Sequence, residues 1–157
     1  MDDLTIARAL HVAALVHWIG GVSMVTLVLL PGIRGAVPAA ERLQLFEMIE
    51  GRFARQARIS TLVAGVSGLW MMHRLAAWNR FADVRFWWID AMVAVWMIFT
   101  LMLFVAEPLV LHRWFRARAA RDADGTFRLV QRLHVALLTV SVGTVVAGVL
   151  GAHGALN

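Results

Sequence analysis

The chain has 157 residues, of which 61% are hydrophobic and only 16% charged, so its apolar share is well above that of a soluble domain. It contains no cysteine, which excludes disulfide bonds, thiolate metal ligands, thiol catalysis and haem attached through a Cys-x-x-Cys-His motif. The formal net charge is +5, and every strongly basic residue is an arginine that flanks an apolar run. This pattern favours anionic lipid headgroups over nucleic acid as the partner.

The first long apolar run covers residues 4–30. It is long enough to cross a hydrocarbon core of about 30 Å as a helix, and the Pro-Gly pair that follows is expected to end it. It is preceded by two aspartates and is longer than the apolar part of a signal peptide, so we do not expect it to be cleaved. His11 and His17 lie inside it, and ionisable groups at membrane depth are candidate functional residues because they are expensive to bury.

Residues 38–52 predict a short amphipathic helix in the membrane interface. Apolar side chains recur there every three to four residues, and an arginine and two glutamates lie off that stripe.

Residues 53–75 form the second predicted span, which is the least hydrophobic of the four. Arg55 and Arg58 in its first turns must reach the headgroups or pair inside the bundle.

Two further spans are predicted over residues 86–115 and 127–152, separated by an arginine-rich loop. Glu107 lies in the third span directly before Pro108, which should kink the helix and leave backbone carbonyls free. The expected fold is all-α: one domain, residues 1–157, forming an integral membrane four-helix bundle with the interfacial helix between its first two spans.

The arginines predict the orientation of this bundle. Eleven of the fifteen lie in the loops, and the adjoining helix ends, that join the first span to the second and the third to the fourth. The cytoplasmic side of a membrane protein carries the excess of positive residues. We therefore expect a multi-pass protein of the bacterial inner membrane with both termini on the periplasmic side.

With this orientation, the rise of about 1.5 Å per helical residue places the ionisable side chains at two depths. The outer layer is expected to contain His11, His73, Asp90 and His153, and the inner layer Glu107, His112, His134, Arg55 and Arg58. Imidazoles from facing helices at matching depth can bind haem iron axially, and arginines can neutralise the haem propionates. The leading prediction is haem b with His11 opposite His73 or His153, and a second inner pair of His112 and His134.

Other roles for the same residues stay open. His73, His112 and His153 lie at helix ends, where a histidine is most often an interfacial residue bonded to water. Copper is the alternative cofactor, because soft ligands suit Cu(I); its expected ligands are His11, His134, Met71, Met72 and His73.

Two acidic residues are candidates for a proton relay, Glu107 and Asp90. For Glu107 a structural role as the partner of Arg58 or His134 is equally open.

The first half of the chain resembles two families of membrane proteins. Leu10-His11, Trp18 and Gly20-Gly21, followed by an apolar run that ends in Leu-Pro-Gly, resemble the first helix of the copper-resistance protein D (CopD) family. The run is also similar to HemJ-type protoporphyrinogen oxidases, whose first helix has a histidine seven residues before a tryptophan, and the similarity continues from Arg52-Phe53 to Gly68. These are inner-membrane proteins of four or more helices, linked to copper movement and to b-type haem respectively. The resemblance implies that His11 is the metal or haem ligand.

Three hypotheses for the function follow. The first is an inner-membrane b-type haem protein in electron transfer or membrane-linked oxidoreduction, including haem-dependent oxidoreductase activity, with a quinone or a redox protein as partner. The second is CopD-like copper binding or transport. The third is a cofactor-free accessory membrane subunit. Assembly into a homo-oligomer is left open in all three.

Overall fold

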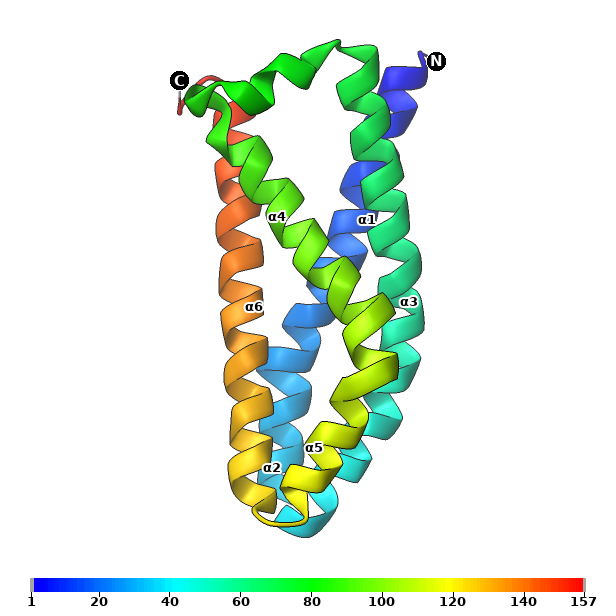
Figure 1. Cartoon of the computed structure of the whole chain (residues 1–157), viewed down its shortest axis with the longest axis vertical. Coiled ribbons are helices and arrows are strands. Elements are labelled where there is room, and N and C mark those ends of the chain that lie inside the picture. Colours follow the sequence, from blue (N-terminus) through cyan, green and yellow to red (C-terminus); the bar gives the residue numbers. More distant parts are fainter. Residues whose placement is uncertain (1, 157) are drawn as a thin grey trace.

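The computed structural model describes residues 2–156, which are helical almost throughout and contain no β-strand. The prediction of an all-α fold is confirmed. Three helical stretches are long and apolar enough to cross a membrane, namely Asp3–Ala36, Val84–Ala119 and Ala123–Ala152. In Figure 1 both termini lie at one end of an elongated molecule, and the tight turn between residues 119 and 123 lies at the other.

The first long helix consists of α1 (Asp3–Met24), a π-helical turn η1 (Val25–Leu29) and α2 (Leu30–Ala36). It continues past the Pro-Gly pair that was expected to end it. Proline is tolerated in the first turn of a helix, because its missing N–H is not needed there. The π-helical turn η1 ends at Leu29, so Pro31 lies in the first turn of α2. The helix ends where Val37 becomes extended, the conformation that a residue before proline prefers.

The second long helix, α3 (Ala39–Arg74), is continuous over 36 residues, or about 54 Å. A separate interfacial helix over residues 38–52 was predicted, but these residues form the first turns of α3. The apolar stripe of these turns packs against other helices of the bundle. Leu43 and Phe46 are buried in a cluster completed by Val25, Leu30, Ile33, Phe127 and Val130. The stripe is therefore part of the helix bundle, in which α3 runs as one continuous helix beside its neighbours (Figure 1).

The second half of the chain begins with a short loop and ends with two more long helices. Asp83 accepts hydrogen bonds from the backbone and side chain of Arg85 in this loop, and the nearby guanidinium lowers the pKa of the Asp83 carboxyl.

The elements of this second half, in chain order, are η2 (Ala77–Ala82), η3 (Val84–Phe86), α4 (Trp87–Leu101), the π-helix η4 (Met102–Leu111), α5 (His112–Ala119) and α6 (Ala123–Ala152).

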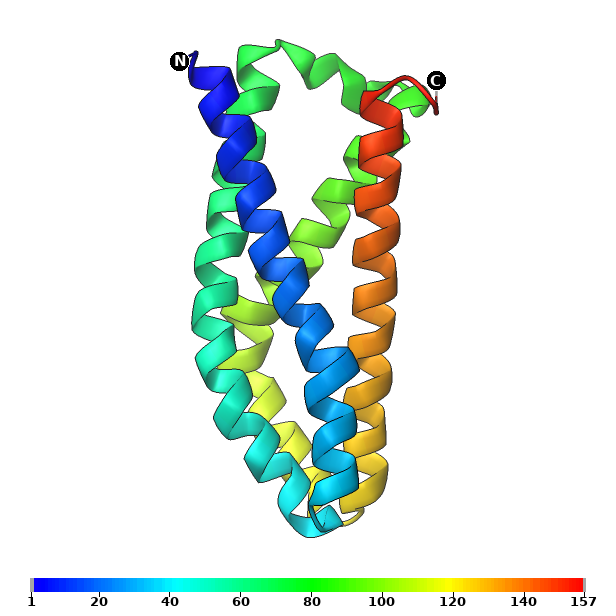
Figure 2. The same ribbon diagram turned by 180° about the vertical axis from the view of Figure 1, so that it is seen from behind.

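The most extensive helix contact is between α1 and α3, followed by that between α4 and α6. Figures 1 and 2 show α4 running obliquely from α6 towards α3. The crossing buries a central cluster of Trp18, Val22, Ala54, Ala57, Phe99 and Leu103. Small residues on α3 permit the close approach of its neighbours, as is common between membrane helices.

Gly65 on α3 provides a test of this packing. A methyl group at this position would overlap the indole of Trp96, whose Nε1 donates a 2.9 Å hydrogen bond to the Thr61 carbonyl and so holds the ring in place. We expect Gly65→Ala to lower the free energy of unfolding by about 1–3 kcal/mol, measured by chemical denaturation in detergent. Gly51→Ala on the same helix, where the added methyl meets nothing within 4 Å, is the control and should be neutral or stabilising. Equal effects of the two changes would contradict the α3–α4 contact.

Candidate functional site

Three ionisable side chains meet in the half of the molecule that contains α2 and α5. Glu50 comes from α3, Glu107 from the π-helix η4 and His112 from the start of α5. One potential ligand atom of each lies within 4.8 Å of those of the other two. Glu107 is only 7% exposed, whereas Glu50 and His112 are half-buried.

Pro108 explains the backbone at this site. A π-helix pairs each carbonyl with the N–H five residues later, so the carbonyl of Leu103 would need the N–H that Pro108 lacks. The guanidinium of Arg58 replaces it, with Nε donating to the Leu103 carbonyl over 2.9 Å. The free carbonyl expected from the sequence is therefore present, and α3 supplies its partner.

Arg58 also holds one side of the Glu107 carboxylate. Its Nη2 donates to Glu107 Oε1 over 3.2 Å, while Glu107 Oε2 is buried and has no hydrogen-bond partner among residues 2–156. Of the two partners left open for Glu107, Arg58 and His134, the structure shows Arg58, and Glu107 keeps one oxygen for another ligand.

The imidazole of His112 is oriented by the same π-helix. Its Nδ1 lies 3.0 Å from the Glu107 carbonyl. Because a carbonyl oxygen can only accept, Nδ1 carries a hydrogen, and in the neutral imidazole Nε2 then has the lone pair. A ring nitrogen of His112 is therefore free to accept a proton or bind a metal ion.

A small cavity of about 30 Å³ lies beside this cluster, with Glu50, His134 and Trp18 in its wall. This is enough volume for one water molecule. His134 Nδ1 donates to the Val130 carbonyl at 2.9 Å, which leaves Nε2 as an acceptor, and the buried Trp18 Nε1 has no partner among the described residues. Glu50, His134 and Trp18 are therefore the residues with polar side-chain atoms in the wall of this cavity.

His11 lies on α1 in the half of the molecule that contains the termini, and its ring faces α3. Nδ1 is 2.9 Å from the Ala64 carbonyl and 3.1 Å from Ser67 Oγ. Gly68 lies beside the ring, where a side chain would press on the imidazole. The contact leaves Nε2 as the ring atom available to a ligand.

The other residues predicted for the outer layer are not brought together with His11. His73, Asp90 and His153 are exposed and make no hydrogen bond, ion pair or ring contact with His11 in the described part of the chain. His153 donates instead to the Val149 carbonyl of its own helix, and His73 packs beside Trp70. These contacts fit the interfacial role that remained open for both histidines.

Of the predicted inner layer, the structure gathers Arg58, Glu107 and His112, whereas Arg55 is exposed. His134 contacts the ring of Phe46 and lies in the wall of the cavity, and it makes no hydrogen bond or ring contact with His112 in residues 2–156. Sequence reasoning missed Glu50, which was placed on the polar side of an interfacial helix. The available signal was its four-residue spacing from the apolar Phe46 and Ala54, which puts all three on one face of a continuous helix.

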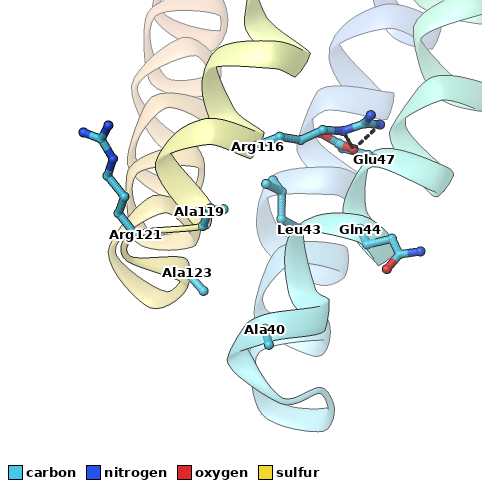
Figure 3. Close-up of a pocket in the computed structure, with 9 residues that line it drawn as sticks. Ala40, Leu43, Gln44, Glu47, Arg116, Ala119, Arg121 and Ala123 are labelled. Carbon is cyan, nitrogen blue, oxygen red and sulfur yellow. Dashed lines mark hydrogen bonds and ion pairs between the residues drawn. The ribbon is translucent and has the colours of Figure 1, made fainter.

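A larger groove of about 790 Å³ opens at the end of the molecule opposite the termini, between α3, α5 and the start of α6. Figure 3 shows Arg116 crossing it to Glu47, with a shortest nitrogen–oxygen distance of 2.8 Å. None of the site residues predicted from the sequence lines this groove.

No family model matches the chain, and comparisons with curated proteins and with solved structures find no match either. The resemblance to the CopD and HemJ-type families stays a prediction. The residues described above therefore carry the argument about function.

Proposed function

We propose that the chain is an inner-membrane protein with four spans, with both termini on the periplasmic side. Three helices have the length and hydropathy of spans, and α3 packs along the first of them over most of its length. The ion pairs of Arg58 with Glu107 and of Arg42 with Asp124 compensate two of the charges that make α3 less apolar. The excess of arginine lies at the end of the bundle away from the termini, which supports the orientation.

Within this bundle we propose that His11 is an axial ligand of a b-type haem in membrane-linked electron transfer, with a quinone or a redox protein as partner. The hydrogen bond from His11 Nδ1 to the Ala64 carbonyl is the observation that carries this proposal. Histidines that bind metals almost always donate their second ring nitrogen to a carbonyl, carboxylate or water, which fixes the ring and leaves the other nitrogen for the metal.

The residues around His11 are compatible with a haem held by this one histidine. In the described part of the chain they do not form an internal pocket in which two histidines could hold a haem. The cavity of about 30 Å³ has room for one water molecule and not for a macrocycle, and Glu50 and His134, not His11, lie in its wall. His11 would hold the haem, and Gly68 beside its imidazole leaves the ring room to keep its orientation. Haem would supply one-electron transfer there, and the chain would supply the oriented imidazole.

The copper alternative has weaker support. Met71, Met72 and His73 occupy consecutive positions of α3, and neighbouring positions on a helix point in different directions, so the three side chains do not converge. His11 alone would then be the copper ligand.

The test is an absorption spectrum of the protein purified in mild detergent from haem-replete cells, with copper measured by elemental analysis in the same samples. We expect a Soret band that shifts on reduction with dithionite. This band should be lost in His11→Ala and retained in His17→Ala, because His17 is exposed on the same helix and makes no hydrogen bond to α3.

Each other outcome points to a different conclusion. Stoichiometric copper that is lost in His11→Ala would favour copper handling. Preparations with neither haem nor copper would favour a cofactor-free accessory subunit. A Soret band that survives in His11→Ala would contradict the assignment of His11 as the ligand.

A further inference from the structure

We propose that Glu50, Glu107 and His112 bind a divalent first-row transition-metal ion, at a site separate from His11. Their potential ligand atoms lie within 4.8 Å of one another and come from three elements, α3, η4 and α5. The proposal is independent of haem binding, because none of these residues contacts His11.

The two carboxylates and the single guanidinium around Glu107 leave one negative charge that a cation would balance. The buried carboxylate of Glu107 and the half-buried carboxylate of Glu50 lie within 4.8 Å of each other, and Arg58 neutralises one of them. The remaining negative charge requires a proton or a metal ion, since like charges at this distance in a region of low dielectric constant are unfavourable. Glu107 Oε2 is buried without a hydrogen-bond partner, so one acceptor atom of the cluster is left unsatisfied.

The donor atoms select the class of ion. Two carboxylate oxygens and one imidazole nitrogen suit Zn²⁺, Mn²⁺ or Fe²⁺, whereas Cu(I) prefers the sulfur ligands that this cluster lacks. Bond lengths of about 2.0–2.2 Å require the donor atoms around one ion to lie close together, and the three atoms here lie within 4.8 Å of one another. Rotation of the Glu50 side chain, which makes no hydrogen bond to other described residues, would bring them together.

The groups around the three residues resemble the outer shell of a metal site. His112 donates Nδ1–H to the Glu107 carbonyl, and Arg58 holds Glu107 Oε1; such contacts orient ligands and fix the histidine tautomer. Glu50 also lies in the wall of the small cavity, which has room for one water molecule. That water would serve as a further ligand. π-Helical segments are frequent at functional sites, and η4 provides Glu107.

The experiment uses the full-length protein in detergent, treated with EDTA and titrated with Zn²⁺ and Mn²⁺ by calorimetry, with Co²⁺ as a spectroscopic probe. We expect one ion per chain, and a decrease in affinity of at least about tenfold in Glu50→Gln and in His112→Ala. Glu50→Gln is the most informative variant. Glu50 makes no hydrogen bond in the described residues, so this change should leave the fold intact. Glu41→Gln, an exposed glutamate on the same helix, and His17→Ala are the controls and should bind like the wild type.

Two results would overturn the proposal. Binding of equal strength in wild type, Glu50→Gln and Glu41→Gln would place the ion elsewhere. Absence of binding, together with an infrared carboxylic-acid band that disappears in Glu50→Gln, would show that the two carboxylates share a proton instead. The haem spectrum of Glu50→Gln is recorded in parallel and should equal that of the wild type, so that failure of one proposal is distinguished from failure of the other.

Discussion

Replacement of Arg58 by methionine is expected to lower the free energy of unfolding by about 3 kcal/mol. The change removes the cation that pairs with the buried Glu107 and the donor that satisfies the Leu103 carbonyl. Leaving a buried carboxylate without its partner typically costs about 3–5 kcal/mol. The lower end applies here, because the Arg58 side chain is 31% exposed and solvent screens its charge. Chemical denaturation in detergent, followed by circular dichroism, measures the change.

Two companion variants separate the charge effect from loss of side-chain packing. Arg58→Met combined with Glu107→Gln should recover a large part of the lost stability, because the unpaired charge has been removed. Arg55→Met should behave like the wild type, because Arg55 is exposed on the same helix and makes no ion pair in the described residues. If Arg55→Met and Arg58→Met were equally destabilising, the interior role of Arg58 would be refuted.

Replacement of Trp18 by alanine should also lower the free energy of unfolding by about 3 kcal/mol. Trp18 is 2% exposed and lies edge-to-face against Phe99, with 4.7 Å between the ring centroids. Its loss would open a void where α1, α3 and α4 meet. Packing contacts of this kind are a main source of helix association in a membrane, where lipid is as apolar as the side chains. The measurement is the denaturation midpoint in detergent.

Trp18→Phe is the conservative variant and should have a much smaller effect. The indole Nε1 of Trp18 has no hydrogen-bond partner among residues 2–156, so phenylalanine gives up ring volume and no polar contact. Trp70→Ala serves as the control on an exposed surface, since Trp70 is 46% exposed. A loss of stability in Trp70→Ala as large as that in Trp18→Ala would speak against the central cluster as the core of the bundle.

The contacts of Arg58 link Pro108 to the candidate metal site. Pro108 removes an N–H, the π-helix leaves the Leu103 carbonyl free, and Arg58 reaches across from α3 to satisfy it. The same guanidinium fixes Glu107 beside Glu50 and His112. The carbonyl left free beside Pro108 and the buried Glu107 thus share one partner, Arg58, next to the candidate metal site.

The sequence by itself determined the helical class, the apolar helices and the carbonyl left free by Pro108. These properties depend on composition and on the covalent chemistry of single residues, both of which are local. The ion pair of Glu107 with Arg58 was one of two alternatives, because both side chains were expected at a similar depth.

Only the tertiary structure decided which polar side chains meet. Periodicity gives the face of a helix, and the direction of that face depends on the neighbouring helices. Glu50 reads as polar surface if residues 38–52 lie flat in the interface, and as interior once α3 is continuous and Phe46 packs against α2 and α6. Likewise, two histidines at equal predicted depth meet only if their helices turn them toward each other, and His11 turns to the backbone of α3.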